Sequence, residues 1–202
     1  TNSSFFFPSA ALAWQFTKLK GLATSPILSF GKLRLTWGQV GIQPQPYQNF
    51  TTFSPASFTD SYANGVSAAS SLYGGGYVRS TTAGNDYLRP ERKTESEIGV
   101  DLRFLNNRFS FSGTAYTNNT KDVILSLNVP YETGYSVRNI NAAELSNKGL
   151  EFDAGADVLP QSAFKWNVSA NFSMNRNKVI SLAGASVYTL PSTYAGQSLI
   201  PG

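Results

Sequence analysis

The sequence predicts an all-β protein: an antiparallel β-barrel segment that crosses a membrane. Three observations support this prediction. About six stretches of roughly 9–12 residues alternate apolar and polar side chains, the pattern of strands with one apolar face. The connections between these stretches alternate between short and long. Charged residues make up 14% of the chain and aromatic residues 13%, which suits a protein with aromatic girdles at two membrane interfaces.

Amphipathic strands alone fit two folds. A soluble β-sandwich packs the apolar face into a core, whereas an outer-membrane barrel turns it toward lipid. The long segment 42–91 favours the barrel, because it holds many Pro, Gly, Ser, Thr and Tyr residues and shows no periodicity. Loops of this length are uncommon in compact soluble domains but are expected outside a membrane barrel. Since so few strands cannot enclose a large lumen, we expect a piece of a bigger barrel.

The first two strands are predicted at residues 7–16 and 30–40. Their apolar faces carry Leu12, Trp14, Phe16, Leu33, Leu35 and Trp37. The opposite face of the second strand is cationic, because Lys32 and Arg34 alternate with these residues. The segment 42–91 follows as a long loop.

The clearest element is a hairpin with strands at 94–104 and 109–117. Its first strand places Ile98, Val100, Leu102 and Phe104 on one face and Glu95, Glu97, Asp101 and Arg103 on the other. Asn106 and Asn107 are expected to form the tight turn, since Asn tolerates positive φ.

A second long loop is predicted at 118–142, and alternation returns at 149–158 and 164–175. The apolar residues of this last hairpin include Leu150, Phe152, Trp166, Phe172 and Met174. Its polar face carries Glu151, Asp153, Asn167 and Asn171. A third loop is predicted at 176–202.

Composition excludes several kinds of chemistry. The chain has no Cys and no His, which removes disulfides, thiolate metal sites and any Ser-His-Asp triad. The net charge is +4, but Lys and Arg are scattered, so a nucleic-acid partner is not expected. No apolar run approaches ~20 residues, so no transmembrane helix is predicted. We expect no cofactor, no metal and no catalytic residue.

Several short motifs occur in order along the chain. They include residues 7–14 (FPSAALAW), 32–41 (KLRLTWGQVG), 88–99 (LRPERKTESEIG), 119–125 (NTKDVIL), 139–144 (NINAAE) and 147–152 (NKGLEF). In this order they resemble the SusC/RagA family of TonB-dependent outer-membrane transporters from Bacteroidetes. Each motif is weak alone, and the series is specific.

The resemblance implies a function and a set of partners. Members of this family are ~22-stranded barrels with an N-terminal plug and a TonB-contacting segment. They import glycan or peptide fragments across the outer membrane, beneath a SusD-like surface lipoprotein. The motifs match the later part of such a barrel, and the plug domain is absent from this sequence. We therefore expect a fragment whose longer parent meets the TonB complex through its N-terminal part and outer-membrane lipid through its strands.

Two groups of residues are candidates for the functional site. The polar faces of the strands predict residues that line the lumen: Arg34, Glu97, Asp101, Arg103, Glu151, Asp153, Asn167 and Asn171. The Tyr-rich loops predict residues that bind substrate: Tyr73, Tyr77, Arg79, Asp86, Tyr87, Tyr131, Tyr135 and Arg138. Aromatic rings with polar neighbours suit sugars or peptides, although the same rings can instead pack the loops against one another.

Two alternatives remain open at this point. The chain could be a secreted β-sandwich that binds carbohydrate. It could also be a glycosidase that uses Glu95 with Glu97, or Glu151 with Asp153, because residues two apart on a strand lie roughly 7 Å apart on one face. The simpler expectation is that these carboxylates line a lumen and are balanced by Arg34, Arg103 and Lys165.

Overall fold

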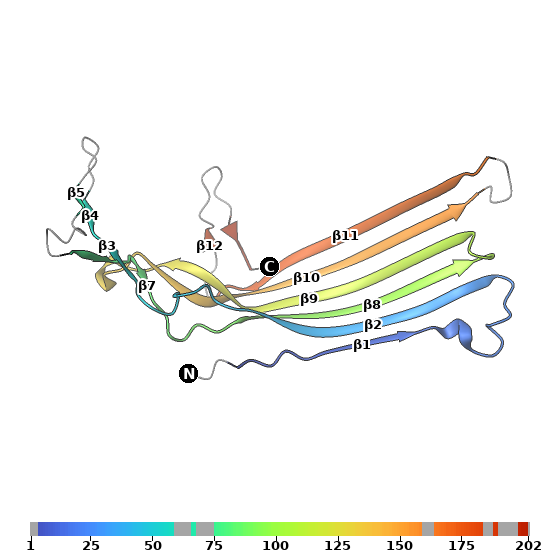
Figure 1. Cartoon of the computed structure of the whole chain (residues 1–202), viewed down its shortest axis with the longest axis horizontal. Helices are drawn as coiled ribbons and strands as arrows, with labels where there is room; N and C mark the ends of the chain where they lie inside the picture. Colours follow the sequence, from blue (N-terminus) through green and yellow to red (C-terminus); the bar gives the residue numbers. More distant parts are fainter. Residues whose placement is uncertain are drawn as a thin grey trace. The chain divides into compact units, whose positions relative to one another are not determined.

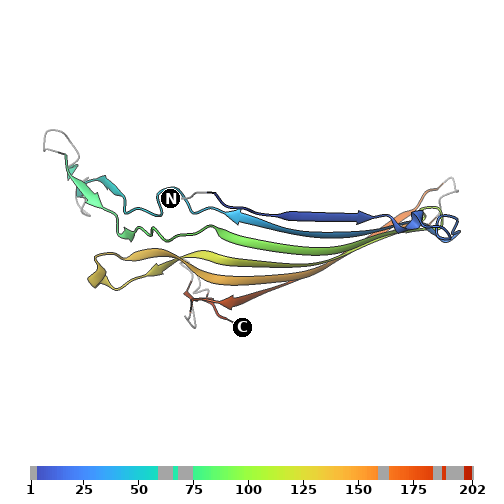
Figure 2. The ribbon, with the colours of Figure 1, turned by 90° about the horizontal axis from the view of Figure 1, so that it is seen from below.

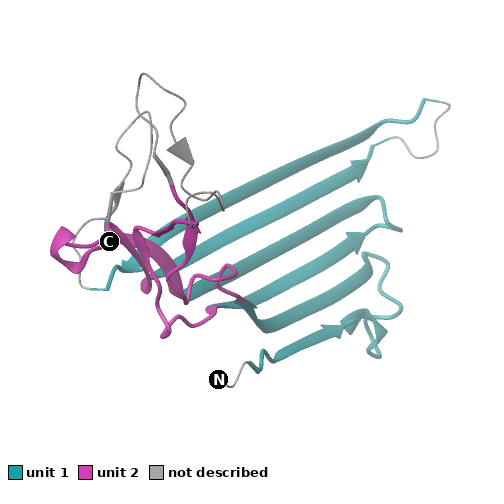
Figure 3. Cartoon of the chain, turned by 60° about the vertical axis from the view of Figure 1, so that its left-hand side comes forward, with its two compact units in different colours: residues 1–41, 92–121, 144–202 teal, residues 42–91, 122–143 magenta. Residues whose placement is uncertain are grey.

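The computed structural model describes residues 4–58, 66–67, 75–158, 164–183, 188–189 and 198–201. The contacts divide the chain into two compact units (Figure 3). Unit 1 comprises Thr1–Gly41, Arg92–Lys121 and Glu144–Gly202, and unit 2 comprises Ile42–Glu91 and Asp122–Ala143. No helix in the described part of the chain is long and apolar enough to cross a membrane.

Unit 1 is built on long strands that lie side by side in one sheet (Figures 1 and 2). The strands are β1 (Ser9–Trp14), β2 (Leu28–Ile42), β8 (Glu91–Phe104), β9 (Phe109–Asn128), β10 (Val137–Asp157) and β11 (Asn167–Ser181). They are hydrogen-bonded in this order, and the hairpins β1–β2, β8–β9 and β10–β11 are antiparallel. The predicted all-β, antiparallel fold class is confirmed.

One face of this sheet is apolar and exposed. Register places Leu12 opposite Leu35, Leu102 opposite Phe111, and Phe152 opposite Phe172. The rings of Phe111, Phe152 and Phe172 form a stacked ladder across β9, β10 and β11, with centroids 6.0 and 6.3 Å apart. Phe172 nevertheless remains 57% exposed. No large side chain among the described residues is fully buried, so the apolar face has no sandwich core to pack against.

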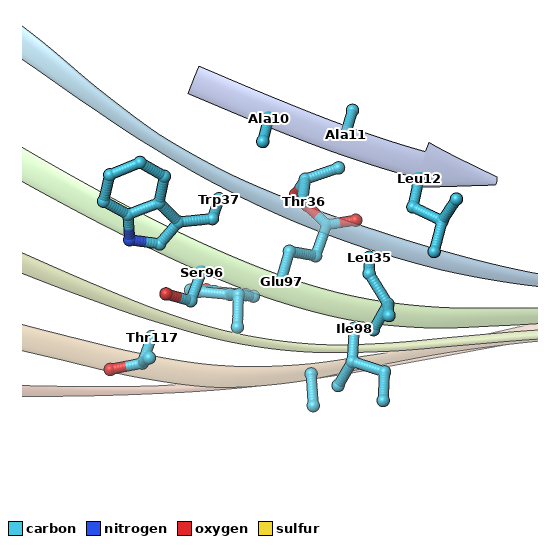
Figure 4. A pocket seen from close by; sticks show the side chains of 12 residues that line it. Ala10, Ala11, Leu12, Leu35, Thr36, Trp37, Ser96, Glu97, Ile98 and Thr117 are labelled. Carbon is cyan, nitrogen blue, oxygen red and sulfur yellow. The ribbon is translucent and has the colours of Figure 1, made fainter. Parts of the chain in front are cut away.

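Small side chains leave a hollow in the apolar face. It measures ≈ 650 Å³ and is lined by residues of β1, β2, β8 and β9, among them Ala10, Leu35, Trp37, Ile98 and Ala115. Figure 4 shows Trp37, Leu35 and Ile98 around it. Because Ala10 and Ala115 fill so little space beside the larger Trp37 and Ile98, the surface is uneven, which a fluid lipid tolerates and a packed core does not.

The hairpin turns of unit 1 match the chain's local chemistry. Between β8 and β9, Asn106 and Asn107 adopt positive φ of 55° and 65°, as predicted, and Leu105 joins them at 51°. Between β1 and β2 the chain forms η1 (Phe16–Lys18). The Phe16 ring covers Gly31, where an added Cβ would stand 2.4 Å from the ring. Phe16 therefore leaves the predicted strand 7–16 to pack on β2.

The predicted loop at 118–142 is wrong for most of its length. Strand β9 continues to Asn128 and β10 begins at Val137, so the connection spans only 129–136. It contains η3 (Tyr131–Thr133). The added strand residues are polar or mixed on both faces, so period-two hydrophobicity gave no signal there. Similarly, β11 extends to Ser181 into the predicted loop 176–202.

Unit 2 replaces the predicted loop 42–91 with short paired strands. Strands β3 (Phe53–Pro55) and β6 (Tyr77–Arg79) are antiparallel, as are β4 (Ser57–Phe58) and β5 (Val66–Ser67). Strand β7 (Thr82–Ala83) pairs with the start of β10 in parallel. In unit 1, β12 (Tyr188–Thr189) pairs with β13 (Ser198–Leu199).

The exposed apolar face makes a prediction about stability in lipid. Phe172→Arg places a charge on that face, whereas Asn171→Arg places the same charge on the polar face one residue away. In the complete protein reconstituted in lipid vesicles, we expect Phe172→Arg to lower the free energy of unfolding by about 2–4 kcal/mol, because a charge near the bilayer midplane must be desolvated. Asn171→Arg should cost under about 1 kcal/mol. Equal losses in denaturant titrations would contradict a lipid-facing role.

Candidate functional site

A charged network on the polar face of unit 1 is centred on Arg34 of β2. Its guanidinium donates hydrogen bonds to Asp101 (3.1 and 3.3 Å) and to Glu97 (3.3 Å) on β8, and to Thr114 (3.2 Å) on β9. Asp101 also accepts from Ser112 at 2.9 Å and pairs with Lys32 Nζ at 3.0 Å. One side chain therefore links three neighbouring strands.

Gly99 makes room for this arrangement. It lies on β8 between Glu97 and Asp101, and a Cβ there would stand 2.7 Å from Arg34 Nη2. Because glycine has no side chain, the guanidinium can lie flat across β8 and reach β9. Glu97 and Asp101, on either side of Gly99, then accept hydrogen bonds from the guanidinium. The sequence Glu-Ile-Gly-Val-Asp at residues 97–101 thus provides both the space and the two carboxylates that bind Arg34 of the neighbouring strand β2.

The other predicted lumen-lining residues lie on the same polar face. Asp153 is opposite Asn171, and Asn167 donates to Asp157 Oδ1 at 2.7 Å. Asp101, Arg103, Asp153 and Asn171 all line a hollow of ≈ 690 Å³. The structure therefore brings together four of the residues that the sequence singled out.

The predicted charge balance is only partly right. Arg34 does pair with Glu97, and Glu95 pairs with Lys93 at 3.1 Å. Arg103 instead lies over the Phe30 ring, 5.3 Å from its centroid. Within the described residues, Glu151 and Asp153 have no ion pair. The alternation of the sequence correctly predicted on which face each charged side chain lies. It could not predict their partners, because these depend on which strands are neighbours in the sheet.

In unit 2, two of the predicted loop residues form a cluster. Arg79 lies over the Tyr135 ring, 4.2 Å from its centroid, and donates a 2.6 Å hydrogen bond to the Gly134 carbonyl. Gly134 has a φ of 74°, which turns its carbonyl out of the η3 segment. The Tyr135 hydroxyl lies 3.5 Å from Thr51 Oγ1. These contacts connect β6, the segment before β3 and the connection between β9 and β10.

The remaining loop candidates are dispersed and open to solvent. Tyr77, Tyr87 and Tyr131 are 71%, 85% and 84% exposed. Asp86 and Arg138 are also exposed. Tyr73 lies outside the described residues. The exposed rings pack on no other aromatic ring within the described part of unit 2, so their apolar surface is available to a ligand.

Asparagines that the sequence analysis did not select, two of them buried, hold unit 2 together. Asn85 and Asn139 are each 6% exposed, and the Asn85 side chain donates to the Asn139 carbonyl at 2.8 Å. Asn141 donates to the carbonyls of Arg89 and Asp122 and accepts from the Arg89 amide. The Asn-x-Asn spacing on a strand, which puts both amides on one face, was the available signal.

The fold and its two contrasting faces define a class of protein, the transmembrane β-barrels of the outer membrane. Comparison with known families agrees: the model of the family described as TonB dependent receptor-like, beta-barrel, matches residues 1–197. The chain belongs to this family. The SusC/RagA resemblance of the motifs is thereby confirmed at the level of TonB-dependent receptors and their barrel.

Several individual proteins are similar to the chain. TonB-dependent receptor P3 of Formosa agariphila is 32% identical over 184 residues, which is 90% of this chain and 17% of the relative. TonB-dependent receptor SusC of Bacteroides thetaiotaomicron is 29% identical over 181 residues, 88% of this chain and 17% of the relative. The chain thus spans under a fifth of these relatives. None of these names describes an enzyme.

A solved structure shares the fold. The RagAB peptide importer in its 'open-open' state superimposes with a TM-score of 0.79 at 24% identity, covering 100% of this chain and 20% of that chain. The chain therefore shares the fold of about a fifth of that longer chain.

The Arg34 network predicts energetic coupling between two strands. A double-mutant cycle with Arg34→Gln and Asp101→Asn in the complete protein should show a coupling of about 1 kcal/mol, since the pair is half-buried and charge-assisted. The control cycle pairs Arg34→Gln with Asp153→Asn, which shares no contact with it, and should be additive within about 0.5 kcal/mol. A first cycle that is equally additive would show that the network does not hold β2 to β8.

Proposed function

We propose that this chain forms part of the barrel wall and extracellular loops of a TonB-dependent importer of glycan or peptide fragments in the bacterial outer membrane. The supporting observation is the contrast between the two faces of the unit 1 sheet. One face is apolar and exposed, and the other carries a connected charged network. In a chain of this family, lipid covers the first face and an aqueous lumen lies along the second.

The wall contributes architecture and polarity rather than covalent chemistry. Its lumen-lining residues are Arg34, Glu97, Asp101, Arg103, Glu151, Asp153, Asn167 and Asn171. Their mixture of both signs and of amides offers hydrogen bonds to a polar substrate without fixing it in one place. Arg34 is held by its carboxylate partners, while Glu151 and Asp153, unpaired within the described residues, are free to meet a solute or another part of the protein.

Unit 2 supplies the substrate-contacting candidates. Exposed aromatic rings stack on apolar faces of sugars or on peptide side chains, and the neighbouring charges orient the polar groups. We assign this role to Tyr77, Tyr87, Tyr131, Tyr135, Arg79, Asp86 and Arg138, together with Tyr73. A SusD-like surface lipoprotein would meet these loops from outside, and the TonB complex would act through the N-terminal part of the longer parent. The name of the RagAB importer favours peptides as one substrate class.

Location and partnership test the proposal directly. Outer and inner membranes of the source cell are separated, and the parent protein is followed with an antibody raised against unit 2 sequences. Recovery in the outer-membrane fraction, with a lipoprotein that co-purifies in mild detergent, supports the importer. Recovery as a monomer in the soluble fraction overturns it.

The exposed tyrosines give a cleaner test of substrate contact. Tyr87→Ala with Tyr131→Ala removes two rings without disturbing internal packing, so the barrel should assemble normally. We expect the half-saturation concentration for uptake to rise about tenfold, the effect of losing one strong aromatic contact. The probes are fluorescently labelled oligosaccharide and peptide mixtures, assayed on whole cells.

Tyr47→Ala is the matched control, because Tyr47 is an exposed tyrosine of the same unit outside the candidate set. Unchanged uptake in this variant and reduced uptake in the double variant support the assignment. If the double variant imports every probe that the wild type imports with unchanged half-saturation, the assignment of these tyrosines is wrong.

A further inference from the structure

Almost all the carboxylates of the described unit 1 strands lie on the polar face, beside the cations Lys32, Arg34, Lys93 and Arg103. The polar face carries the carboxylates Glu95, Glu97, Asp101, Glu151, Asp153 and Asp157. The apolar face also carries five cations, on the parts of β8, β9, β10 and β11 that lie beyond its apolar residues, toward the long connections: Arg92, Lys121, Lys148, Arg176 and Lys178. Glu144 is the one carboxylate beside them within the described part of unit 1.

Register shows how these cations continue the apolar face. Leu150 and Met174 are opposite each other on β10 and β11, and both belong to that face. Two residues further along, Lys148 lies opposite Arg176. Lys178 follows after another two residues on β11, roughly 7 Å along the strand. The change from hydrocarbon to positive charge is therefore abrupt, within one step of the pleat.

Four of these five cations have no ion pair within the described residues. Lys121 pairs with Glu144 at 3.4 Å, but Arg92, Lys148, Arg176 and Lys178 have no ion pair with any described residue. All four are exposed. Like charges directly opposite on antiparallel strands repel each other, so the Lys148–Arg176 pair is unfavourable by itself. An anion from outside the chain would reverse the sign of that interaction.

The position of the cations indicates what that anion is. Long connections of outer-membrane barrels lie on the extracellular side, and short turns lie on the other. The cations thus border the apolar band at its extracellular edge, where lipid headgroups begin. The short-turn end of the same face finishes in the exposed Trp166 of the β10–β11 connection, a neutral interfacial residue. The cations of the short-turn end, Lys18, Lys20, Arg108 and Lys165, lie in its turns and connections, whereas Lys148, Arg176 and Lys178 lie on the strands beside the apolar residues.

We propose that Lys148, Arg176 and Lys178 form a binding site for the phosphate of a membrane-lipid headgroup in the outer leaflet. The guanidinium of Arg176 suits bidentate contact with phosphate oxygens, and the two ammonium groups supply point charges on either side. Lys121 and Arg92 extend the site along the neighbouring strands. The acyl chains of the same lipid would lie on the apolar face that begins at Leu150 and Met174. This inference rests on the proposed membrane placement.

Lipid retention tests the site in the complete protein. Wild type and variants are reconstituted in nanodiscs of phosphatidylglycerol and phosphatidylcholine. Native mass spectrometry then counts the lipids that stay bound when the protein is released from the nanodisc. The wild type should retain phosphatidylglycerol selectively. Lys148→Gln with Arg176→Gln and Lys178→Gln should weaken that binding on the order of 100-fold, since each basic residue near an anionic surface contributes comparably. The charge-keeping variant Lys148→Arg with Arg176→Lys and Lys178→Arg should retain the lipid.

The control removes the same charge elsewhere. The control variant combines Lys18→Gln, Lys20→Gln and Lys165→Gln, three changes at the short-turn end of the strands. It should leave the retention of phosphatidylglycerol unchanged. Equal phosphatidylglycerol retention by the Lys148 triple variant, or equal retention of phosphatidylcholine by the wild type, overturns the site. Binding of inorganic phosphate with no bound lipid also overturns it. A wild type that needs no lipid or detergent would instead refute the membrane placement itself.

Discussion

Period-two alternation across a continuous hydrogen-bonded sheet is the constraint on which unit 1 depends. Each strand must keep one set of side chains in lipid and the other in water, while its backbone groups pair with neighbouring strands. A slip of one residue in the pairing of β8 would turn Glu97 and Asp101 outward and Ile98 and Val100 inward. The sheet therefore needs devices that fix register, and the two faces supply different ones.

On the apolar face, stacked aromatic rings fix the register of the strands. On the polar face, a hydrogen-bonded network of charged side chains does so. The stacked rings of Phe111, Phe152 and Phe172 align β9, β10 and β11. Arg34 aligns β2 with β8 and β9 through Asp101, Glu97 and Thr114. Ring stacking is insensitive to dielectric, whereas a guanidinium–carboxylate network requires the polar side. Each device thus works in the environment that its face meets.

The sequence was informative where the two faces differ and silent where they do not. The strands around Ile98–Phe104 and Leu150–Ala156 could be predicted because alternation was strong. Beyond Thr117 on β9, and before Gly149 on β10, both faces are polar or mixed, so long regular strands looked like loops. The stacking of Arg79 on Tyr135 could not be predicted either, because these residues are far apart in the chain and meet only through the pairing of unit 2.

Basic residues that are far apart in the sequence can lie close together in the folded sheet. Lys121, Lys148 and Arg176 are separated by more than two dozen positions each, and no run of basic residues draws attention to them. Strand length and register bring Lys148 and Arg176 face to face at one edge of the apolar band. Meanwhile the carboxylates that would neutralise them point to the other face, with Asp101 already held by Arg34 and Lys32. Lys148, Arg176 and Lys178 therefore gather positive charge at one edge of the apolar face, where in our proposal headgroup phosphates are the anions within reach.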